Sequence, residues 1–542
     1  MKLYLSGHED RYAIEQLLLC LFPLEKIDAE TADPAALRRL CRAAAARAAS
    51  SEAFSPLQAG RRGTASAVDE GPGETAPDRP APDASADYVV STLSRGERYL
   101  TASAVICRGG VRTRAVQRLA LANETYALRR RILQRSCYLA AMPHLPAPPP
   151  WGAMSGVRPT KITTRHLLSG GTPASADRLL RDVFFVSPER RKLCVRASEF
   201  TVRAASLLEP TDLSVYVGIP FCPTRCAYCS FVSQTIGSAG ALLGPYLDCL
   251  LREIETVGAA LRQTGRRVRT LYIGGGTPTT LSAEQLKILM EAIARHFDLD
   301  RLIEYTVEAG RPDTVTPEKL RVIRSLGANR VSINPQTMND DVLRAARRPH
   351  TAADVERAYA QAVDAGFTHI NMDLIAGLAG DDPASFEASL RRVLALDPSN
   401  VTVHTLTLKK GADLFSDRAG LPAQADVEQM VRFADEILAA RGYEPYYLYK
   451  QKYMAGSLEN VGWCRDKDAC LYNIYMMEEL HSILALGGGA VSKRNLSASK
   501  LVRQCNPKFP KEYVERISDV LSAKRELIAA LQDDGMRQSL PD

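Results

Sequence analysis

The chain has 542 residues, of which 46% are hydrophobic and 24% are charged, and it carries a formal net charge of +7. These ordinary globular values allow a large hydrophobic core, and the modest charge does not by itself indicate nucleic acid or an anionic ligand as the partner. No apolar run reaches the ~18 residues of a membrane-spanning helix, and His8, Glu9 and Asp10 interrupt the apolar character that a signal peptide needs. We therefore expect a cytoplasmic protein whose 12 cysteines are thiols or metal ligands rather than disulfides.

The first part of the chain predicts an α+β domain over residues 1–145. Within it, a stretch at about 48–86 is rich in Pro, Gly, Ser and Ala and nearly free of large apolar residues, so we expect a disordered insertion there. A Pro-rich linker with bridging helices follows over residues 146–205. The expected elements of the first domain are, in order, a strand at 2–5, a helix at 11–21, an Ala- and Arg-rich helix, two β-like runs at 88–93 and 98–107, and a basic helix at about 119–141.

From about residue 213, β-like runs alternate with amphipathic helical stretches. This alternation predicts an α/β fold with a parallel sheet and right-handed crossovers, curled into a partial (β/α)6 barrel of the TIM type over residues 206–420. The active site of such a barrel lies at the carboxyl ends of its strands. We expect residues 421–542 to form a small α+β domain that covers the barrel mouth. The expected barrel strands are, in order, "LSVYVGI", "TLYIG", "IEYTVEAG", "RVSINPQ", "HINMDLIAG" and "VTVHTLTL".

Three cysteines follow the first barrel strand in "IPFCPTRCAYCSF". Cys222, Cys226 and Cys229 form a C-x3-C-x2-C pattern. Structural zinc takes four ligands, and no Cys or His follows at a usable spacing; catalytic zinc with three cysteines is uncommon, and a redox C-x2-C pair would not need Cys222. The pattern therefore favours a [4Fe–4S] cluster held by three thiolates, with the fourth iron open for a ligand.

Three successive glycines, Gly274 to Gly276, follow the second barrel strand in "GGGTPTT". Glycine lets the backbone approach a ligand and present amide groups to it. A flexible turn between strand and helix is the alternative, but it would not need three glycines.

The cysteine motif, with Tyr228 before its last cysteine, and the "GGGTPT" motif together resemble the radical S-adenosylmethionine (SAM) enzymes. The resemblance implies that the methionine group of SAM chelates the open iron and that an electron from the cluster cleaves the sulfonium to a 5′-deoxyadenosyl radical. Over about 205–500 the chain is similar to the oxygen-independent coproporphyrinogen III oxidase family. The segment "PWGAMSGVRPTKI" at 150–162 is typical of the HemZ-type branch of that family.

The same resemblance implies a set of SAM contacts. Gln336 and Arg348 also have structural alternatives, a helix cap for the first and a solvated arginine for the second. The resemblance assigns no catalytic residue. The SAM contacts that it implies are Tyr216, Tyr228, Gly275, Gly276, Thr277, Glu308, Gln336, Arg348 and Asp373.

Two positions depart from the family pattern. The coproporphyrinogen enzymes carry a further cysteine two residues after the third cluster ligand, where this chain has Phe231. The related haem-chaperone branch carries an HNxxYW motif, and the corresponding stretch here, "YNIYMM", begins with Tyr472 instead of histidine.

The family resemblance implies an oxidoreductase of haem biosynthesis that decarboxylates the tetrapyrrole coproporphyrinogen III to protoporphyrinogen IX, with an electron donor such as flavodoxin or ferredoxin. A haem-binding chaperone of the same family is the alternative. The basic stretch 108–135 would suit an enzyme acting on RNA, but it lacks the interleaved aromatic residues that stack on bases, which argues against nucleic acid. The cations that we expect near the substrate carboxylates, or otherwise as solvated surface charges, are Arg158, Lys161, Lys409, Lys410, Lys450 and Lys452.

Overall fold

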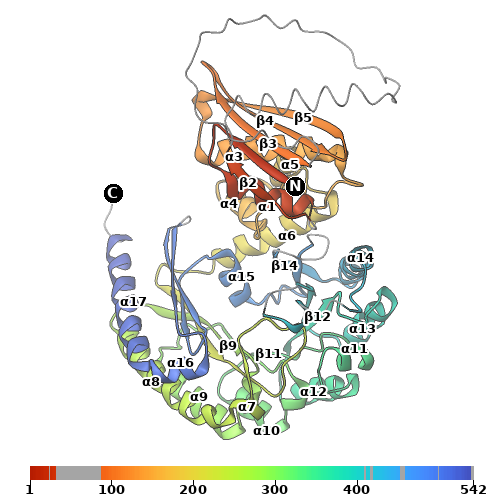
Figure 1. The fold of residues 1–542 in the computed structure, drawn as a ribbon. Helices are drawn as coiled ribbons and strands as arrows, with labels where there is room; N and C mark the ends of the chain where they lie inside the picture. Colours follow the sequence, from red (N-terminus) through yellow and green to blue (C-terminus); the bar gives the residue numbers. More distant parts are fainter. Residues whose placement is uncertain are drawn as a thin grey trace, which may run out of the picture. The chain divides into compact units, whose positions relative to one another are not determined.

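The chain divides into two compact units (Figure 1). Unit 1 contains residues 1–155 and 183–186, and unit 2 contains residues 156–182 and 187–542. The expected insertion at 48–86 lies outside the described residues. The computed structural model describes residues 1–22, 25–31, 87–407, 411–415, 419–451, 458–497 and 500–538.

Unit 1 contains a five-stranded sheet in the order β2-β1-β3-β4-β5. Leu17 of α1 and Leu133 of α3 belong to the same hydrophobic core as Ile106 of β4, so these helices cover the apolar face of the sheet. The elements are β1 (Lys2–Ser6), α1 (Arg11–Leu21), β2 (Asp28–Thr31), β3 (Tyr88–Arg95), β4 (Tyr99–Arg108), β5 (Val111–Ala120) and α3 (Tyr126–Ala141).

The expected helix at 119–141 was placed too early. Residues 111–120 form strand β5, which pairs antiparallel with β4. The helix begins at Tyr126 because the side chain of Thr125 accepts a hydrogen bond from the backbone N–H of Leu128 (3.2 Å) and caps its first turn. The basic stretch is therefore split between a strand and a helix.

Unit 2 is built on an eleven-stranded sheet in which the six expected barrel strands are adjacent and parallel. The helices that connect them lie on the outer side of the curved sheet (Figure 1). Among the described strands the two outermost of the six do not pair with each other, so the barrel is partial. The six strands are β6 (Asp212–Ile219), β9 (Arg267–Gly275), β10 (Glu304–Glu308), β11 (Arg330–Ser332), β12 (His369–Ala376) and β13 (Asn400–Thr405).

The helices of unit 2 include the expected bridging helices before the barrel. None of the described helices is long and apolar enough to cross a membrane. The main helices are α4 (Thr160–Leu168), α5 (Pro173–Phe184), α6 (Pro188–Ala205), α8 (Leu243–Arg262), α9 (Ala283–His296), α10 (Pro317–Ser325), α11 (Asp340–Ala345), α12 (Ala352–Asp364), α13 (Pro383–Ala395), α14 (Gln424–Ala440), α16 (Pro510–Glu515) and α17 (Ile517–Gln538).

The strands that follow the barrel extend the same sheet at both ends. β14 (Glu444–Tyr449) and β15 (Asn460–Cys464) continue it beyond β13, and β15 pairs with β13 antiparallel. β16 (Ile483–Leu486) pairs parallel with β6, and β17 (Val491–Ser497) and β18 (Lys500–Cys505) follow it. The proposed domain boundary at residue 421 remains a prediction, but these strands share one sheet with the barrel.

Helix α15 (Leu471–Glu478) lies at the amino ends of the barrel strands. Glu304, the first residue of β10, accepts hydrogen bonds from the backbone N–H groups of Leu471 (2.7 Å) and Tyr472 (2.8 Å). Arg330, the first residue of β11, pairs with the same carboxylate (Nε to Oε2, 3.5 Å). α15 is thus at the opposite end of the barrel from the mouth that residues 421–542 were expected to cover.

Candidate functional site

The three cysteines lie on one loop at the carboxyl end of β6. Cys226 is buried and Cys222 and Cys229 are half-buried. The Cys229 N–H donates to the Cys226 carbonyl (3.1 Å). The N–H of Ala227, the residue after Cys226, donates to the carbonyl of Ala346 before α12 (3.1 Å), and these two hydrogen bonds fix the loop. Among the described residues no three His, Cys, Asp or Glu side chains are placed to hold a single metal ion. In a [4Fe–4S] cluster each thiolate ligates its own iron, which is a different requirement.

The glycines after β9 pack directly on the cysteine loop. Gly276 N–H donates to the carbonyl of Ile219 (2.8 Å), and Thr277 donates from its N–H to Phe221 (2.8 Å) and from its hydroxyl to Cys222 Sγ (3.5 Å). A Cβ atom on Gly276 would lie 2.6 Å from the Phe221 carbonyl oxygen and 3.0 Å from Cys222 Sγ. Only glycine permits this approach, so the run does more than make a flexible turn.

Glu308 ends β10 beside this glycine run. Its carboxylate accepts hydrogen bonds from the Tyr272 hydroxyl (2.5 Å) and the Gly275 N–H (3.2 Å). Burial raises the pKa of Glu308 to about 7; the two hydrogen bonds oppose this shift, and the charge of Asp373 adds to it. The carboxyl group is therefore close to half-ionised at neutral pH.

Three tyrosines stack next to Glu308. The ring of Tyr272 lies 4.6 Å from that of Tyr472 on α15, and Tyr216 on β6 stacks with both (6.2 and 6.3 Å between centroids). Tyr216 was expected as a SAM contact; Tyr272 and Tyr472 were not. Tyr472 stands at the position of the histidine in the chaperone motif, so a phenol ring takes the place of an imidazole in this stack.

Gln336, four residues after the end of β11, forms an isolated β-bridge with Leu374 of β12, the strand that carries Asp373. The Gln336 N–H donates to the Asp373 carbonyl (2.9 Å), and Gln336 Oε1 is a buried atom without a hydrogen-bond partner among the described residues. The alternative of a helix cap is wrong, because Asn339 caps α11. Burial alone would raise the pKa of Asp373, but His404 (Nε2 to Oδ2, 3.7 Å) and Asn371 (2.7 Å) hold it below its usual value, so this carboxylate is ionised.

Arg348 lies under the cysteine loop rather than in solvent. It is 4% exposed and donates to the Tyr228 hydroxyl (3.1 Å), the Asn334 carbonyl (2.7 Å) and Cys226 Sγ (3.7 Å). Its neighbour Arg347 has a side chain that is 60% exposed and pairs with Asp413. The alternative of a solvated arginine therefore describes Arg347 and not Arg348.

The basic residues that were expected near the substrate carboxylates either form contacts elsewhere or lie outside the described residues. Arg158 (2.5 Å) and Lys161 both pair with Glu479, the C-cap residue of α15, so they attach the segment before the barrel to that helix. Lys450 is 5% exposed. Lys409, Lys410 and Lys452 lie outside the described residues.

Sequence reasoning missed Arg311, Tyr272 and His404 as residues of the site. Tyr272 lies in the expected strand "TLYIG", Arg311 directly follows the expected strand "IEYTVEAG", and His404 lies in the last expected strand, "VTVHTLTL", four residues before its end in Leu408. The alternation of side chains along a strand would have placed Tyr272 and His404 in the barrel interior. No sequence signal marks Arg311 as a partner of Cys226.

Comparison with known proteins identifies the family. Residues 216–393 match the Radical SAM superfamily. The chain is 37% identical over 380 residues to the oxygen-independent coproporphyrinogen-III oxidase-like protein HemZ of Bacillus subtilis, covering 69% of this chain and 76% of that protein. The fold is that of a radical SAM protein. The chain belongs to the oxygen-independent coproporphyrinogen III oxidase family and is similar to its HemZ-type members.

Other relatives in the family differ in their named activities. The chain is 35% identical to the heme chaperone HemW of Bacillus subtilis, over 43% of this chain and 62% of that protein. It is 34% identical to the oxygen-independent coproporphyrinogen III oxidase of Pseudomonas aeruginosa, over 43% of this chain and 51% of that protein. Coproporphyrinogen III oxidase HemN from Escherichia coli aligns with a TM-score of 0.47 at 25% identity, covering 59% of this chain and 72% of that chain.

Membership of the radical SAM superfamily implies a [4Fe–4S] cluster and SAM, and the described residues fit both. A [4Fe–4S] cluster of this kind needs three cysteine thiolates, which one loop supplies here, and hydrogen-bond donors to their sulfur atoms. Thr277 and Arg348 are such donors. A polar ligand needs unsatisfied groups, and the buried Oε1 atom of Gln336 is one. The close contact of Gly276 with the loop places the glycine run directly against Cys222.

Proposed function

We propose that Cys222, Cys226 and Cys229 hold a [4Fe–4S] cluster and that SAM binds beside it at the carboxyl ends of the strands. When bound, the cluster and SAM supply a carbon-centred radical that removes a hydrogen atom from the substrate. The contact of the Gly276 backbone with Phe221 and Cys222 carries this proposal, because it joins the two expected binding motifs in one site. The SAM contacts would come from Tyr216, Tyr228, Gly275, Gly276, Thr277, Glu308, Gln336, Arg348 and Asp373.

In this proposal Glu308 and Asp373 play different parts. Asp373 is ionised and suits the hydroxyl groups of the SAM ribose, which donate hydrogen bonds to a carboxylate. Glu308, with a pKa of about 7, becomes a fixed negative charge when a cationic ligand favours its ionised form. The Tyr216–Tyr272–Tyr472 stack closes the space beneath these groups and keeps water away from the reacting atoms.

We infer that the substrate is a tetrapyrrole, with coproporphyrinogen III as the best candidate. Oxidative decarboxylation of a propionate removes one hydrogen atom from its β-carbon, one CO2 and one electron, and it leaves a vinyl group. The printed names of the HemZ and Pseudomonas aeruginosa relatives support this substrate. A small electron carrier such as flavodoxin or ferredoxin would reduce the cluster.

The alternative proposal is a haem chaperone, supported by the similarity to HemW. The structure of α15 argues against it. Tyr472, at the position of the motif histidine, is 5% exposed and stacked against two other rings, so its hydroxyl is not presented to a haem iron.

Anaerobic reconstitution of the full chain tests these proposals. We expect about four irons per chain and visible cluster absorbance, both lost in Cys226→Ser and retained in Cys505→Ser, whose cysteine is exposed and lies on β18. Incubation with SAM and a strong reductant should give 5′-deoxyadenosine, and mass spectrometry of added coproporphyrinogen III reads loss of CO2. Full iron content and SAM cleavage in Cys226→Ser would refute the cluster assignment, whereas stoichiometric haem binding without SAM cleavage would favour the chaperone.

A further inference from the structure

We propose that Arg311 is a positioning residue that places a second positive charge on the sulfur of Cys226 and thereby raises the reduction potential of the cluster. The inference rests on the proposed function, because it needs a cluster on the three cysteines. Arg311 follows β10 and precedes the short helix η5 (Pro312–Thr314).

Two guanidinium groups meet at one cysteine sulfur. Arg311 Nη1 and Arg348 Nη1 each lie 3.7 Å from Cys226 Sγ, and both arginines are almost fully buried (3% and 4% exposed). Cys222 receives instead a neutral hydroxyl donor, Thr277. Both of these buried positive charges therefore fall on the middle cysteine of the motif.

Arg311 is held in this position from two sides. Its Nη2 donates to the Thr224 hydroxyl (3.1 Å) and its Nη1 lies 3.5 Å from the Thr224 carbonyl, both within the cysteine loop. On the other side, its Nε and Nη2 donate to the two oxygens of Asp313 (3.0 and 2.9 Å), a bidentate pair that fixes the plane of the guanidinium.

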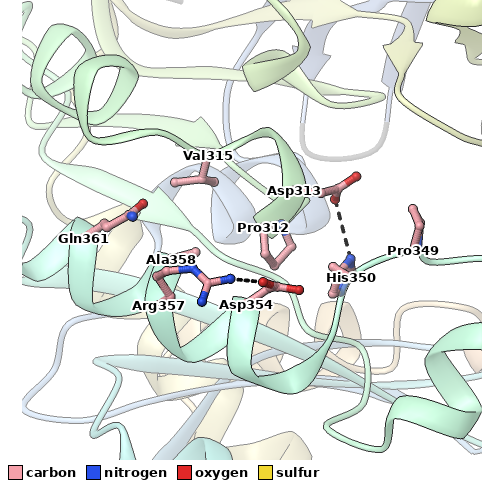
Figure 2. A pocket seen from close by; sticks show the side chains of 9 residues that line it. All are labelled: Pro312, Asp313, Val315, Pro349, His350, Asp354, Arg357, Ala358 and Gln361. Carbon is pink, nitrogen blue, oxygen red and sulfur yellow. Dashed lines mark hydrogen bonds and ion pairs between the residues drawn. The ribbon is translucent and has the colours of Figure 1, made fainter.

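The far side of Asp313 faces a cavity outside the barrel. Figure 2 shows His350 pointing at Asp313, with Nδ1 at 3.5 Å from Oδ1, in the wall of a cavity of about 250 Å³ formed by the η5 segment and α12. Burial alone would raise the pKa of Asp313, but His350 and Arg311 hold this pKa well below its usual range. Asp313 therefore stays ionised and remains paired with Arg311. Arg311 is thus fixed through residues that belong to neither the SAM contacts nor the barrel interior.

The physical effect follows from charge. Reduction adds one negative charge to the cluster, and hydrogen bonds and positive charge at a ligand sulfur stabilise the reduced form. In the buried surroundings of Arg311 this attraction is weakly screened by solvent. Loss of the Arg311 charge should shift the equilibrium between the reduced and oxidised cluster about tenfold toward the oxidised form. For a one-electron couple this corresponds to a reduction potential that is lower by about 59 mV.

The test is a redox titration of the reconstituted full chain without SAM, followed by electron paramagnetic resonance of the reduced cluster. We expect Arg311→Gln to keep its iron and to show the lower potential. Arg321→Gln is the matched control, since Arg321 is an exposed arginine on α10, and its potential should equal that of the wild type. If Arg311→Gln assembles no cluster, Arg311→Lys decides: an ammonium group cannot bridge Asp313 and Cys226 as the guanidinium does, so its potential should lie below that of the wild type.

Failure of this inference is distinguishable from failure of the proposed function. A wild-type chain that assembles no [4Fe–4S] cluster would refute the proposed function. Clusters of equal iron content and equal potential in the wild type and in either Arg311 variant would overturn the role of Arg311 and leave the proposed function intact.

Discussion

The hydroxyl of Tyr272 on β9 donates a 2.5 Å hydrogen bond to Glu308 on β10, so the aromatic stack that includes Tyr472 of α15 is directly joined to the carboxyl group at the mouth. Both residues point into the barrel because each lies at an inward position of its strand. The pair gives the site a buried carboxyl group whose charge depends on what binds near it.

The first prediction concerns the pH dependence of SAM binding. The pKa of Glu308 in the folded protein, about 7, lies above its ordinary value of 4.5. Its ionisation therefore costs free energy in the empty protein, and stability should fall as pH rises from about 4.5 through 7. SAM carries a sulfonium cation that favours the ionised form, so binding should strengthen over the upper part of the same range.

We expect SAM to bind about tenfold more tightly at pH 8 than at pH 6, as ionisation of a group with a pKa near 7 requires. Anaerobic equilibrium dialysis of the reconstituted protein measures the affinity for SAM at each pH. Glu308→Gln should bind SAM weakly and without this pH dependence, whereas Glu318→Gln, on the exposed first turn of α10, should behave like the wild type. A tenfold pH effect that persists in Glu308→Gln would assign the titration to another group.

The second prediction concerns the glycine run. Gly276→Ala places a methyl group against the Phe221 carbonyl and Cys222 Sγ, and backbone atoms cannot yield as a flexible side chain can. We expect reduced iron content and loss of SAM cleavage with little change in overall folding. Gly244→Ala is the matched control, because its added Cβ meets nothing within 4 Å and alanine is about 1 kcal/mol more favourable than glycine inside a helix. Equal iron content and SAM cleavage in both variants would show that the close approach is not needed.

How much the sequence could predict depends on the range of the contacts. The six barrel strands were recoverable because each is a short apolar run that ends in glycine or polar residues, and the position of the cysteines and of Glu308 followed from the strand order. Arg311 and Tyr472 could not be recognised, because their partners lie 85 and 200 or more residues away and pairing at that distance leaves no local pattern. The place of α15 was missed for the same reason, since it depends on Glu304 accepting from its first N–H groups.

The third prediction concerns the amino end of the barrel. Arg330 is 5% exposed and pairs with Glu304 and with Asp468 (2.6 Å). Arg330→Ala removes the cation that the two carboxylates share and leaves the more deeply buried Glu304 without it, and breaking a buried pair in this way costs about 3–5 kcal/mol. We expect a lower melting temperature and faster amide hydrogen exchange in residues 471–478. Arg321→Ala, on the exposed face of α10, should change neither; equal exchange in the two variants would mean that α15 is held by its apolar contacts alone.

The last prediction concerns the chemistry that follows SAM cleavage, where Phe231 replaces the extra cysteine of the coproporphyrinogen enzymes. Phe231 is 69% exposed, and phenylalanine can exchange neither protons nor electrons. Cys464 and Cys470 are the cysteines of the C-terminal region that could substitute for a thiol at position 231, but both are buried near the amino ends of the strands. Burial raises the pKa of Cys464 to about 12 and that of Cys470 well above its usual range, and Cys470 Sγ lies 3.4 Å from Glu304 Oε1. Neither is placed to act as a reactive thiol.

Cleavage of SAM and decarboxylation should therefore be separable in this protein. We expect the wild type to form 5′-deoxyadenosine in excess over vinyl product, and Phe231→Cys to raise the ratio of vinyl product to deoxyadenosine without loss of stability, because an exposed side chain contributes little to folding. Phe509→Cys, at another exposed phenylalanine (42%), controls for the addition of a surface thiol. Both products are quantified by anaerobic chromatography and mass spectrometry. Fast and tightly coupled decarboxylation by the wild type, unchanged in Cys464→Ser and Cys470→Ser, would show that this site needs no thiol, and the role of position 231 would then be limited to its shape.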